Sequence, residues 1–489
     1  MSANLTKLAG QVAIYGISSV VARLLNYLLV PYYTRIMSPA EYGIITDIYA
    51  LIPFALVVLT LGMESGYFRF AARAGSDEER SKVYGTTWGA VLVAASLFLG
   101  VVLLFESPIS AALGYADTPY VTITALIIFL DVAGAIPFVR LRQEGRALRY
   151  VAIRLLSVIV NIGLCLLFYT AQPAGLQLFA TPTDPGYAFV ANLVASVITF
   201  VLLVVSCRKG RVVADRKLLR TIFLYSLPLL ISGIAGTANE FIDRQMIKFL
   251  LPAGESLAQL GIYGAVVKIG VVMMLFTQMY RLAAEPYFLA EFKRDEFKNA
   301  NAEVMKYFVI VSLAIFLVIT LFADLFALIV GPAFREGIYI LPVVLVGNAL
   351  SGVVLNLSFW YKQTGATRFA IRITGVGLLF TIVFNILLVP SLGYAGAALA
   401  RLICEAAMVV VSYRLMQKHY PTPYPLRRIF AYVGVAALLW GLSLLTAQLP
   451  AVAHYGLNAV MVALFVVGAI RVERINVAGL LHSILRRGK

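Results

Sequence analysis

The sequence predicts an all-α integral membrane protein with about fourteen transmembrane helices. Of its 489 residues, 61% are hydrophobic and only 13% are charged, and a soluble protein could not bury so much apolar surface. Uncharged stretches of roughly 18 residues or more, which is enough to cross a bilayer, recur along the whole chain. Because lipid offers the backbone no hydrogen-bond partner and the alternating pattern of a membrane barrel is absent, these stretches are expected to be helices.

The expected spans form two groups of six followed by a final pair. Those of the first half lie near residues 12–33, 43–63, 83–105, 119–139, 152–170 and 186–207. Those of the second half lie near residues 220–240, 260–281, 306–323, 337–360, 372–390 and 393–413, and the last two near 429–447 and 452–470. The chain is therefore predicted to have an N-lobe (1–210), a C-lobe (211–420) and an accessory pair with a cytoplasmic tail (421–489).

The basic residues orient these spans. With the N-terminus in the cytoplasm, 33 of the 40 Lys and Arg residues fall in cytoplasmic segments, and the C-terminus is cytoplasmic as well. Four fall in outside loops, namely Arg35, Arg244, Lys248 and Arg335. Three fall inside spans, namely Arg23, Lys268 and Arg401. The net charge of +16 therefore reports topology and attraction to anionic membrane lipids, and no nucleic-acid partner is expected.

The two halves share landmarks. Tyr42-Gly43 opens the second span and Tyr263-Gly264 the eighth, and IRLLSVIVNIGLCLLF from Ile153 is similar to IRITGVGLLFTIVFNILLV from Ile371. The alternative is that two runs of membrane helices share composition without sharing descent. If the repeat is real, six spans per repeat place two pseudo-symmetric lobes in one orientation around a central cavity.

Charged residues within spans are candidates for function, because a charge at mid-bilayer costs roughly 2.5 to 3.5 kcal/mol even on the most lenient scale. The candidates for binding a substrate in the cavity are Arg23, Lys268 and Arg401. The candidates for coupling or gating within spans are Asp47, Asp131 and Glu405. Glu240, Asp243 and Arg244 form a further group of such candidates at the outer end of the seventh span.

Among these, Arg23 is the first candidate for contacting an anionic substrate, because guanidinium binds phosphate oxygens bidentately. The alternative is a salt bridge within the protein. Arg401 and Glu405 are four residues apart on one helical face and can neutralise each other. Asp47 and Lys268 each follow their landmark glycine by four residues, so we expect them to face each other and to pair in one conformation only.

The sequence shows no sign of catalysis or of a cofactor. It has no GxxxxGK[ST] phosphate-binding stretch, and its three histidines lack metal-ligand spacing, so no metal site is predicted. Its three cysteines, Cys165, Cys207 and Cys404, are odd in number and lie in or beside apolar stretches, so a disulfide framework is not expected. The chain is therefore expected not to be an enzyme.

Three segments carry a family resemblance. They are YGISSVVARLLNYLLVPYYTRIMSPAEYGIITDIYAL in the opening spans, DRQMIKFLLPAGESLAQLGIYGAVVKIGVVM at the centre, and TQMYRLAAEPYF directly after it. They resemble the polysaccharide transporter, or oligosaccharide flippase, family. That family belongs to the superfamily of multidrug and toxin extruders and the lipid II flippase.

The resemblance implies two six-helix lobes with an added helical pair and transport by alternating access. The implied cargo is an oligosaccharide linked to undecaprenyl pyrophosphate, carried from the cytoplasmic to the periplasmic leaflet of the bacterial inner membrane. The implied pathway is surface polysaccharide biosynthesis such as that of O-antigen, with the polymerase and ligase machinery as partners. Arg23 matches a first-span arginine associated with substrate binding in the lipid II relative. Asp243, Arg244 and Lys268 match a recurrent pattern to which no role is assigned.

Two other functions stay open. A cation-coupled multidrug exporter would need acidic cavity residues for its drug and for H⁺ or Na⁺, and Asp47, Asp131 and Glu405 suit it, whereas Arg23 and Lys268 favour the flippase. A non-transporting scaffold or membrane-embedded enzyme of envelope assembly has no motif in its favour. The coupling ion and the sugar are not visible in the sequence.

Overall fold

The computed structural model describes residues 20–21, 24–171, 177–207, 215–291, 297–366 and 368–474. Within these ranges the chain is helical and contains no strand. The first helices are α2 (Leu29–Ile36), α3 (Pro39–Leu59), α4 (Met63–Arg73), α5 (Asp77–Leu104), α6 (Glu106–Ala112), α7 (Tyr120–Gln143), α8 (Ala147–Leu166) and α9 (Gly186–Ser206). The following ones are α10 (Arg216–Leu250), α11 (Ala253–Ile269), α12 (Val271–Glu291), α13 (Phe297–Leu321), α14 (Ala323–Ala327), α15 (Leu341–Leu357), α16 (Phe359–Gln363), α17 (Arg368–Leu392), α18 (Tyr394–His419), α19 (Leu426–Leu445) and α20 (Ala451–Val472).

The predicted all-α membrane fold is confirmed. Twelve helices of the described chain are long and apolar enough to cross a bilayer. The broken pair α11 and α12, bent by 48° at Gly270, makes a thirteenth if it counts as one span. The count of fourteen is not confirmed, because the first predicted span, 12–33, is described only at residues 20–21 and 24–33.

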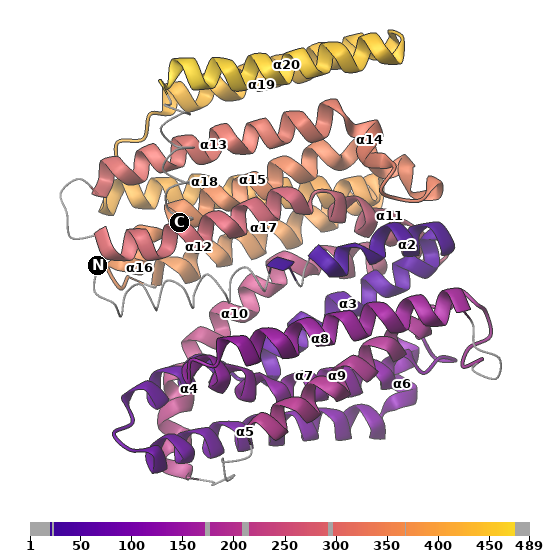
Figure 1. The fold of residues 1–489 in the computed structure, drawn as a ribbon, viewed down its shortest axis with the longest axis vertical. Coiled ribbons are helices and arrows are strands. Elements are labelled where there is room, and N and C mark those ends of the chain that lie inside the picture. The colour runs from indigo at the N-terminus through magenta and orange to yellow at the C-terminus, as the bar shows by residue number, and fades with distance from the viewer. Residues whose placement is uncertain are drawn as a thin grey trace. The chain divides into compact units, whose positions relative to one another are not determined.

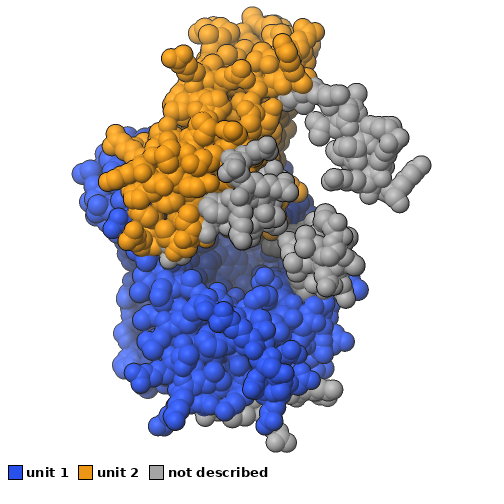
Figure 2. Space-filling view, turned by 90° about the vertical axis from the view of Figure 1, so that its left-hand side faces the viewer, with its two compact units in different colours: residues 1–268, 331–334, 370–404 blue, residues 269–330, 335–369, 405–489 orange. Residues whose placement is uncertain are grey.

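The chain forms two compact units (Figure 2). The first comprises Met1–Lys268, Gly331–Phe334 and Ala370–Cys404, and the second comprises Ile269–Val330, Arg335–Phe369 and Glu405–Lys489. These two units are groups of residues that pack together, whereas the predicted lobes are halves of a sequence repeat. The units therefore do not test the predicted lobes, 1–210, 211–420 and 421–489, which stay a prediction.

In the first unit, α5, α7, α8 and α9 pack against one another (Figure 1). Helix α7 lies at the centre, since 56% of its apolar stretch is buried in the protein, against 22% for α5 and for α8. Val91, Val132 and Leu203 have no exposed surface and fill the space between these helices. The remaining apolar faces of α5 and α8 are left for lipid.

A capping box starts α3. The Ser38 hydroxyl accepts a hydrogen bond from the backbone N–H of Glu41, and the Glu41 carboxylate accepts one from the backbone N–H of Ser38 at 2.8 Å. Pro39 occupies the first turn, where its missing N–H costs nothing. The helix thus begins four residues before the predicted span, and Asp47 lies in its third turn.

Helix α10 is longer than expected. Its first turn is capped by Asp215, whose carboxylate accepts hydrogen bonds from the backbone N–H groups of Lys217 and Leu218, and its 35 residues extend over about 52 Å. The predicted span ended at residue 240 and placed Arg244 and Lys248 in an outside loop. The loop was wrong, because the helix continues to Leu250 through its polar last turns. The outside location of these two residues stays a prediction.

In the second unit, α13 packs against α12, α15 and the terminal hairpin of α19 and α20 (Figure 1). Polar contacts tie both ends of this hairpin to α13. The ammonium of Lys306 lies 2.5 Å from the carboxylate of Glu473, and Asn458 donates to the backbone carbonyl of Leu321 at 2.6 Å. The hairpin is thus an integral part of the second unit.

Candidate functional site

The described site candidates lie on five helices, and all of them except Glu405 belong to the first unit. Arg23 lies outside the described residues. Asp47 lies on α3, Asp131 on α7, Lys268 on α11 and Arg401 on α18. Glu240, Asp243 and Arg244 lie on α10. The structure gathers most of these residues around the second half of α10.

Asp47 has no exposed surface and is held by three donors. Lys248 pairs with its carboxylate, Gln245 donates to it at 2.7 Å, and the Tyr115 hydroxyl donates at 2.6 Å. The Lys248 ammonium also lies 4.2 Å from the centre of the Tyr115 ring. One carboxylate and one ammonium therefore neutralise each other within the protein.

In this structure Asp47 pairs with Lys248 and not with Lys268. The expectation that Asp47 and Lys268 pair in one conformation only stays a prediction. Lys268 instead donates to the hydroxyl of Tyr42 at 2.8 Å, with its ammonium 5.0 Å from the centre of the same ring. Among the described residues, Lys268 forms no ion pair with a carboxylate.

Helices α3 and α11 cross with their backbones in direct contact. A Cβ atom added to Gly43 would lie 1.9 Å from the carbonyl oxygen of Leu257, and one added to Gly261 would lie 1.9 Å from that of Pro39. A Cβ on Gly264 would meet the Thr46 hydroxyl at 2.5 Å. Only glycine permits this approach, which brings Tyr42 on α3 within reach of Lys268 on α11.

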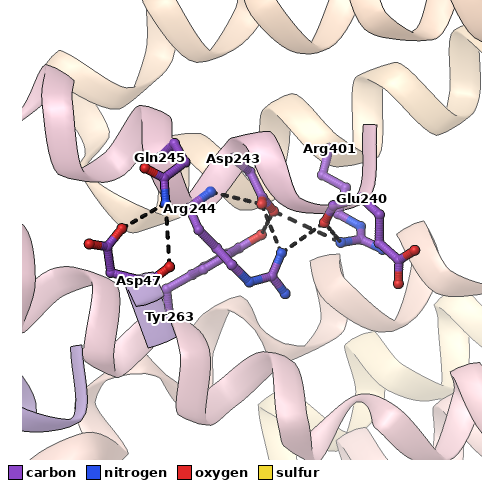
Figure 3. Close-up of polar contacts among 7 residues, drawn as sticks. All are labelled: Asp47, Glu240, Asp243, Arg244, Gln245, Tyr263 and Arg401. Atoms are coloured by element: carbon purple, nitrogen blue, oxygen red, sulfur yellow. Dashed lines mark hydrogen bonds and ion pairs between the residues drawn. The ribbon is translucent and has the colours of Figure 1, made fainter. Parts of the chain in front are cut away.

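Asp243 is the centre of a second cluster (Figure 3). Its carboxylate accepts a hydrogen bond from Arg244 at 2.9 Å and another from the hydroxyl of Tyr263, and it lies 3.9 Å from the guanidinium of Arg401. The side chain of Asp243 is 2% exposed, against 12% for Arg244 and 17% for Arg401. The acid is therefore enclosed, while both cations keep some accessible surface.

Glu240 takes part in this cluster through its backbone. Its carbonyl oxygen accepts hydrogen bonds from Arg244 at 2.8 Å and Arg401 at 3.5 Å (Figure 3). Its carboxylate is exposed and has no partner among the described residues. An exposed carboxylate within a span requires a polar or aqueous surrounding.

The two other acidic candidates lie apart from these clusters. Asp131 is half-buried and accepts a hydrogen bond from Ser196 on α9 at 2.9 Å. Glu405 is buried on α18, one turn after Arg401, and belongs to the second unit. Within the described chain, no group of three or more His, Cys, Asp or Glu side chains has an arrangement that could hold a metal ion.

Several contacting residues were not among the candidates. Lys248, Gln245 and Tyr115 surround Asp47, while Tyr42 and Tyr263 bind Lys268 and Asp243. One signal for Lys248 was present, since it was among only four cations assigned to the outside, against the general rule for basic residues. The tyrosines carry no signal of this kind.

A family model described as polysaccharide biosynthesis protein matches residues 8–290, more than half of the chain. No curated protein matches.

Solved transporter structures share the fold. The lipid II flippase MurJ in an inward closed conformation has a TM-score of 0.73 at 14% sequence identity, covering 95% of this chain and 100% of its own. An inward-facing multidrug resistance MATE family transporter of the MOP superfamily has a TM-score of 0.64 at 17% identity, covering 84% and 95%. A MOP superfamily transporter from Pyrococcus furiosus, described as having a binding pocket of reverse polarity that suggests a different function, has a TM-score of 0.53 at 17% identity, covering 84% and 94%.

Proposed function

Because the chain belongs to the family of polysaccharide biosynthesis proteins, we propose that it is a flippase for a lipid-linked oligosaccharide. The cargo is a sugar chain joined through a pyrophosphate to a polyprenyl lipid such as undecaprenol. It moves from the cytoplasmic to the periplasmic leaflet of a bacterial inner membrane, in which both chain termini face the cytoplasm. A lipid II flippase with the same fold supports this proposal. The chain acts as a transporter and not as an enzyme.

The observation that carries the proposal is the ammonium of Lys268. It lies within a broken span, is only half-buried and forms no ion pair with a described carboxylate. Its described hydrogen bond goes to Tyr42, so an ammonium with three N–H groups keeps donors for a ligand. A cation kept in a span at a cost of roughly 2.5 to 3.5 kcal/mol is explained by an anionic ligand.

The charges favour a pyrophosphate over a cationic drug. Asp47 and Asp243 are both buried and already occupied by donors, so neither offers a free carboxylate to a cation. The exposed carboxylate of Glu240 is the feature that supports the alternative, a cation-coupled multidrug exporter. The pairing around Asp47 and the close crossing of α3 and α11 support a gating role for this region in alternating access.

Deleting the gene and complementing the strain tests this proposal. Lipid-linked glycan should accumulate on the cytoplasmic leaflet of the deletion strain. The wild-type gene should restore its export, Lys268→Gln should not, and Lys268→Arg should restore it in part because the charge is retained. Arg23→Ala belongs in the same series. Normal surface glycan combined with greater drug sensitivity in the deletion strain would instead identify the multidrug exporter.

A further inference from the structure

The Asp243 carboxylate contacts side chains from three helices, its own included, and binds one edge of the Arg244 guanidinium. Its contacts come from Arg244 on its own helix α10, from Tyr263 on α11 and from Arg401 on α18. The hydrogen bonds of Arg244 to Asp243 and to the carbonyl of Glu240 both start from the same nitrogen, Nη1. The edge of the guanidinium formed by Nε and Nη2 has no acceptor in the described part of the chain.

That unoccupied edge is suited to an anion. Nε–H and Nη2–H point in parallel and bind two oxygens of one phosphate group. The Arg244 side chain is 12% exposed, so the edge is partly accessible, and the ring of Tyr263 lies 5.9 Å from the guanidinium carbon. Tyr263 has no exposed surface and fixes the Asp243 carboxylate from the neighbouring helix.

We infer that Asp243 is a positioning residue for anion binding: it fixes the Nη1 edge of Arg244 so that the Nε and Nη2 edge receives a phosphate group. The inference rests on the proposed function, because the ligand is the pyrophosphate of that cargo. Asp243 thereby favours binding of the anion by orienting Arg244, even though the negative charge of its carboxylate, taken alone, would weaken that binding. Asp243 itself does not touch the ligand.

Glu240 provides a matched control. It lies one turn before Arg244 on the same helix, carries the same charge as Asp243, and does not hold either arginine with its carboxylate. If only charge mattered, Asp243→Asn and Glu240→Gln would both strengthen binding of an anion. If Asp243 positions Arg244, the two substitutions have effects of opposite sign.

The test uses the full-length protein in lipid nanodiscs with farnesyl diphosphate as the probe and calorimetry as the readout. Asp243→Asn should weaken binding on the order of tenfold, the factor expected from one charge-assisted hydrogen bond. Tyr263→Phe should weaken it less, and Glu240→Gln should strengthen it slightly. Binding by Asp243→Asn that equals or exceeds that of the wild type would overturn the inference. Absence of saturable binding to the wild type would instead count against the proposed function.

A second readout needs no ligand and stays informative in that case. Phenylglyoxal modifies accessible guanidinium groups, and mass spectrometry locates the modified arginines. Asp243→Asn should speed modification of Arg244 several-fold, whereas Glu240→Gln should not. Equal rates in the wild type and Asp243→Asn would show that Asp243 does not hold Arg244, whatever the ligand. The thermal midpoint and gel-filtration profile of each variant show whether it is folded.

Discussion

Two charged residues, each one turn beyond a glycine of the predicted repeat, have opposite surroundings. Asp47, four residues after Gly43, is fully buried and receives Lys248, Gln245 and Tyr115. Lys268, four residues after Gly264, is half-buried, and its described hydrogen bond goes to a neutral tyrosine. Charge is balanced around Asp47 and unbalanced around Lys268.

The difference separates two uses of charge in a membrane protein. A buried ion pair contributes to holding helices together and offers no unpaired charge to a ligand. An accessible cation without a counter-ion contributes little to the fold and is available to an anion from outside. The comparison therefore predicts that substitutions around Asp47 act on stability, and that substitutions at Lys268 act on binding.

The largest effect is expected from breaking the buried pair on one side only. Lys248→Met leaves Asp47 charged and buried without a counter-ion and should lower the free energy of unfolding by about 3 to 5 kcal/mol. The double variant Lys248→Met with Asp47→Leu should recover most of that loss, since no charge then stays buried. Thermal unfolding in nanodiscs measures both. Equal destabilisation by the single and double variants would contradict the idea of a neutralised pair.

The crossing of α3 and α11, which links the two regions, should give the next largest effect. Gly261→Ala places a methyl group against the carbonyl oxygen of Pro39 and should cost about 1 to 3 kcal/mol of stability through overpacking. Because α11 must move away from α3, the contact between Lys268 and Tyr42 should be lost as well. Cysteine cross-linking between α3 and α11 measures the separation.

Gly375→Ala on α17 is the control for this crossing. No atom lies within 4 Å of its added Cβ, so it should be neutral or stabilise by up to about 1 kcal/mol through helix propensity. A similar loss of stability in both variants would mean that glycine content matters and not the crossing itself.

A smaller effect on stability is expected at Lys268. Lys268→Gln removes one hydrogen bond, worth about 1 kcal/mol, and also removes the desolvation cost of a charge, so the unfolding midpoint should hardly change. Binding of farnesyl diphosphate should nevertheless fall. If Lys268→Gln unfolds as readily as Lys248→Met, the two regions do not differ in the way proposed.

The smallest effect is expected at Asp215, a partly exposed acid outside the two regions compared. At the start of α10, backbone N–H groups and Lys82 lower the pKa of Asp215 to about 2. Its folded pKa is below the unfolded value of 3.8, so its contribution is present above about pH 4 and is lost as the pH falls towards 2. Asp215→Asn should therefore lower the unfolding midpoint slightly at pH 7 and not at pH 2. A difference that persists at pH 2 would assign the effect to the cap and not to the charge.

The helices themselves could be predicted because an apolar stretch of sufficient length must form a helix in lipid, where its backbone has no other hydrogen-bond partners. The boundaries failed where polar residues continue a helix. The segment from Glu240 to Lys248 reads as a loop on hydropathy, and its helical state depends on tertiary contacts with Asp47 and on the cluster around Asp243. No local pattern contains those contacts.

Most charged residues of the candidate site could be predicted, but the contacts that they form with one another could not. Asp47, Lys268 and Arg401 were candidates for their charge within spans, and Asp243 and Arg244 for their place at the outer end of the seventh span. The repeat register did not indicate that Asp47 pairs with Lys248 in this structure. Register compares positions within two halves, whereas pairing depends on which helices cross. Gly43 and Gly264 were noticed as markers of the repeat, and they lie at the crossing of α3 and α11.

The glycines at this crossing allow the packing of α3 against α11 to be assessed in related chains from their sequences alone, without solving their structures. A side chain at position 43 or 261 would overlap a carbonyl oxygen of the neighbouring helix, so a related chain with any other residue there cannot bring α3 and α11 together in this way. Comparing these two positions across relatives would divide them into chains that can adopt this arrangement and chains that must pack these helices differently.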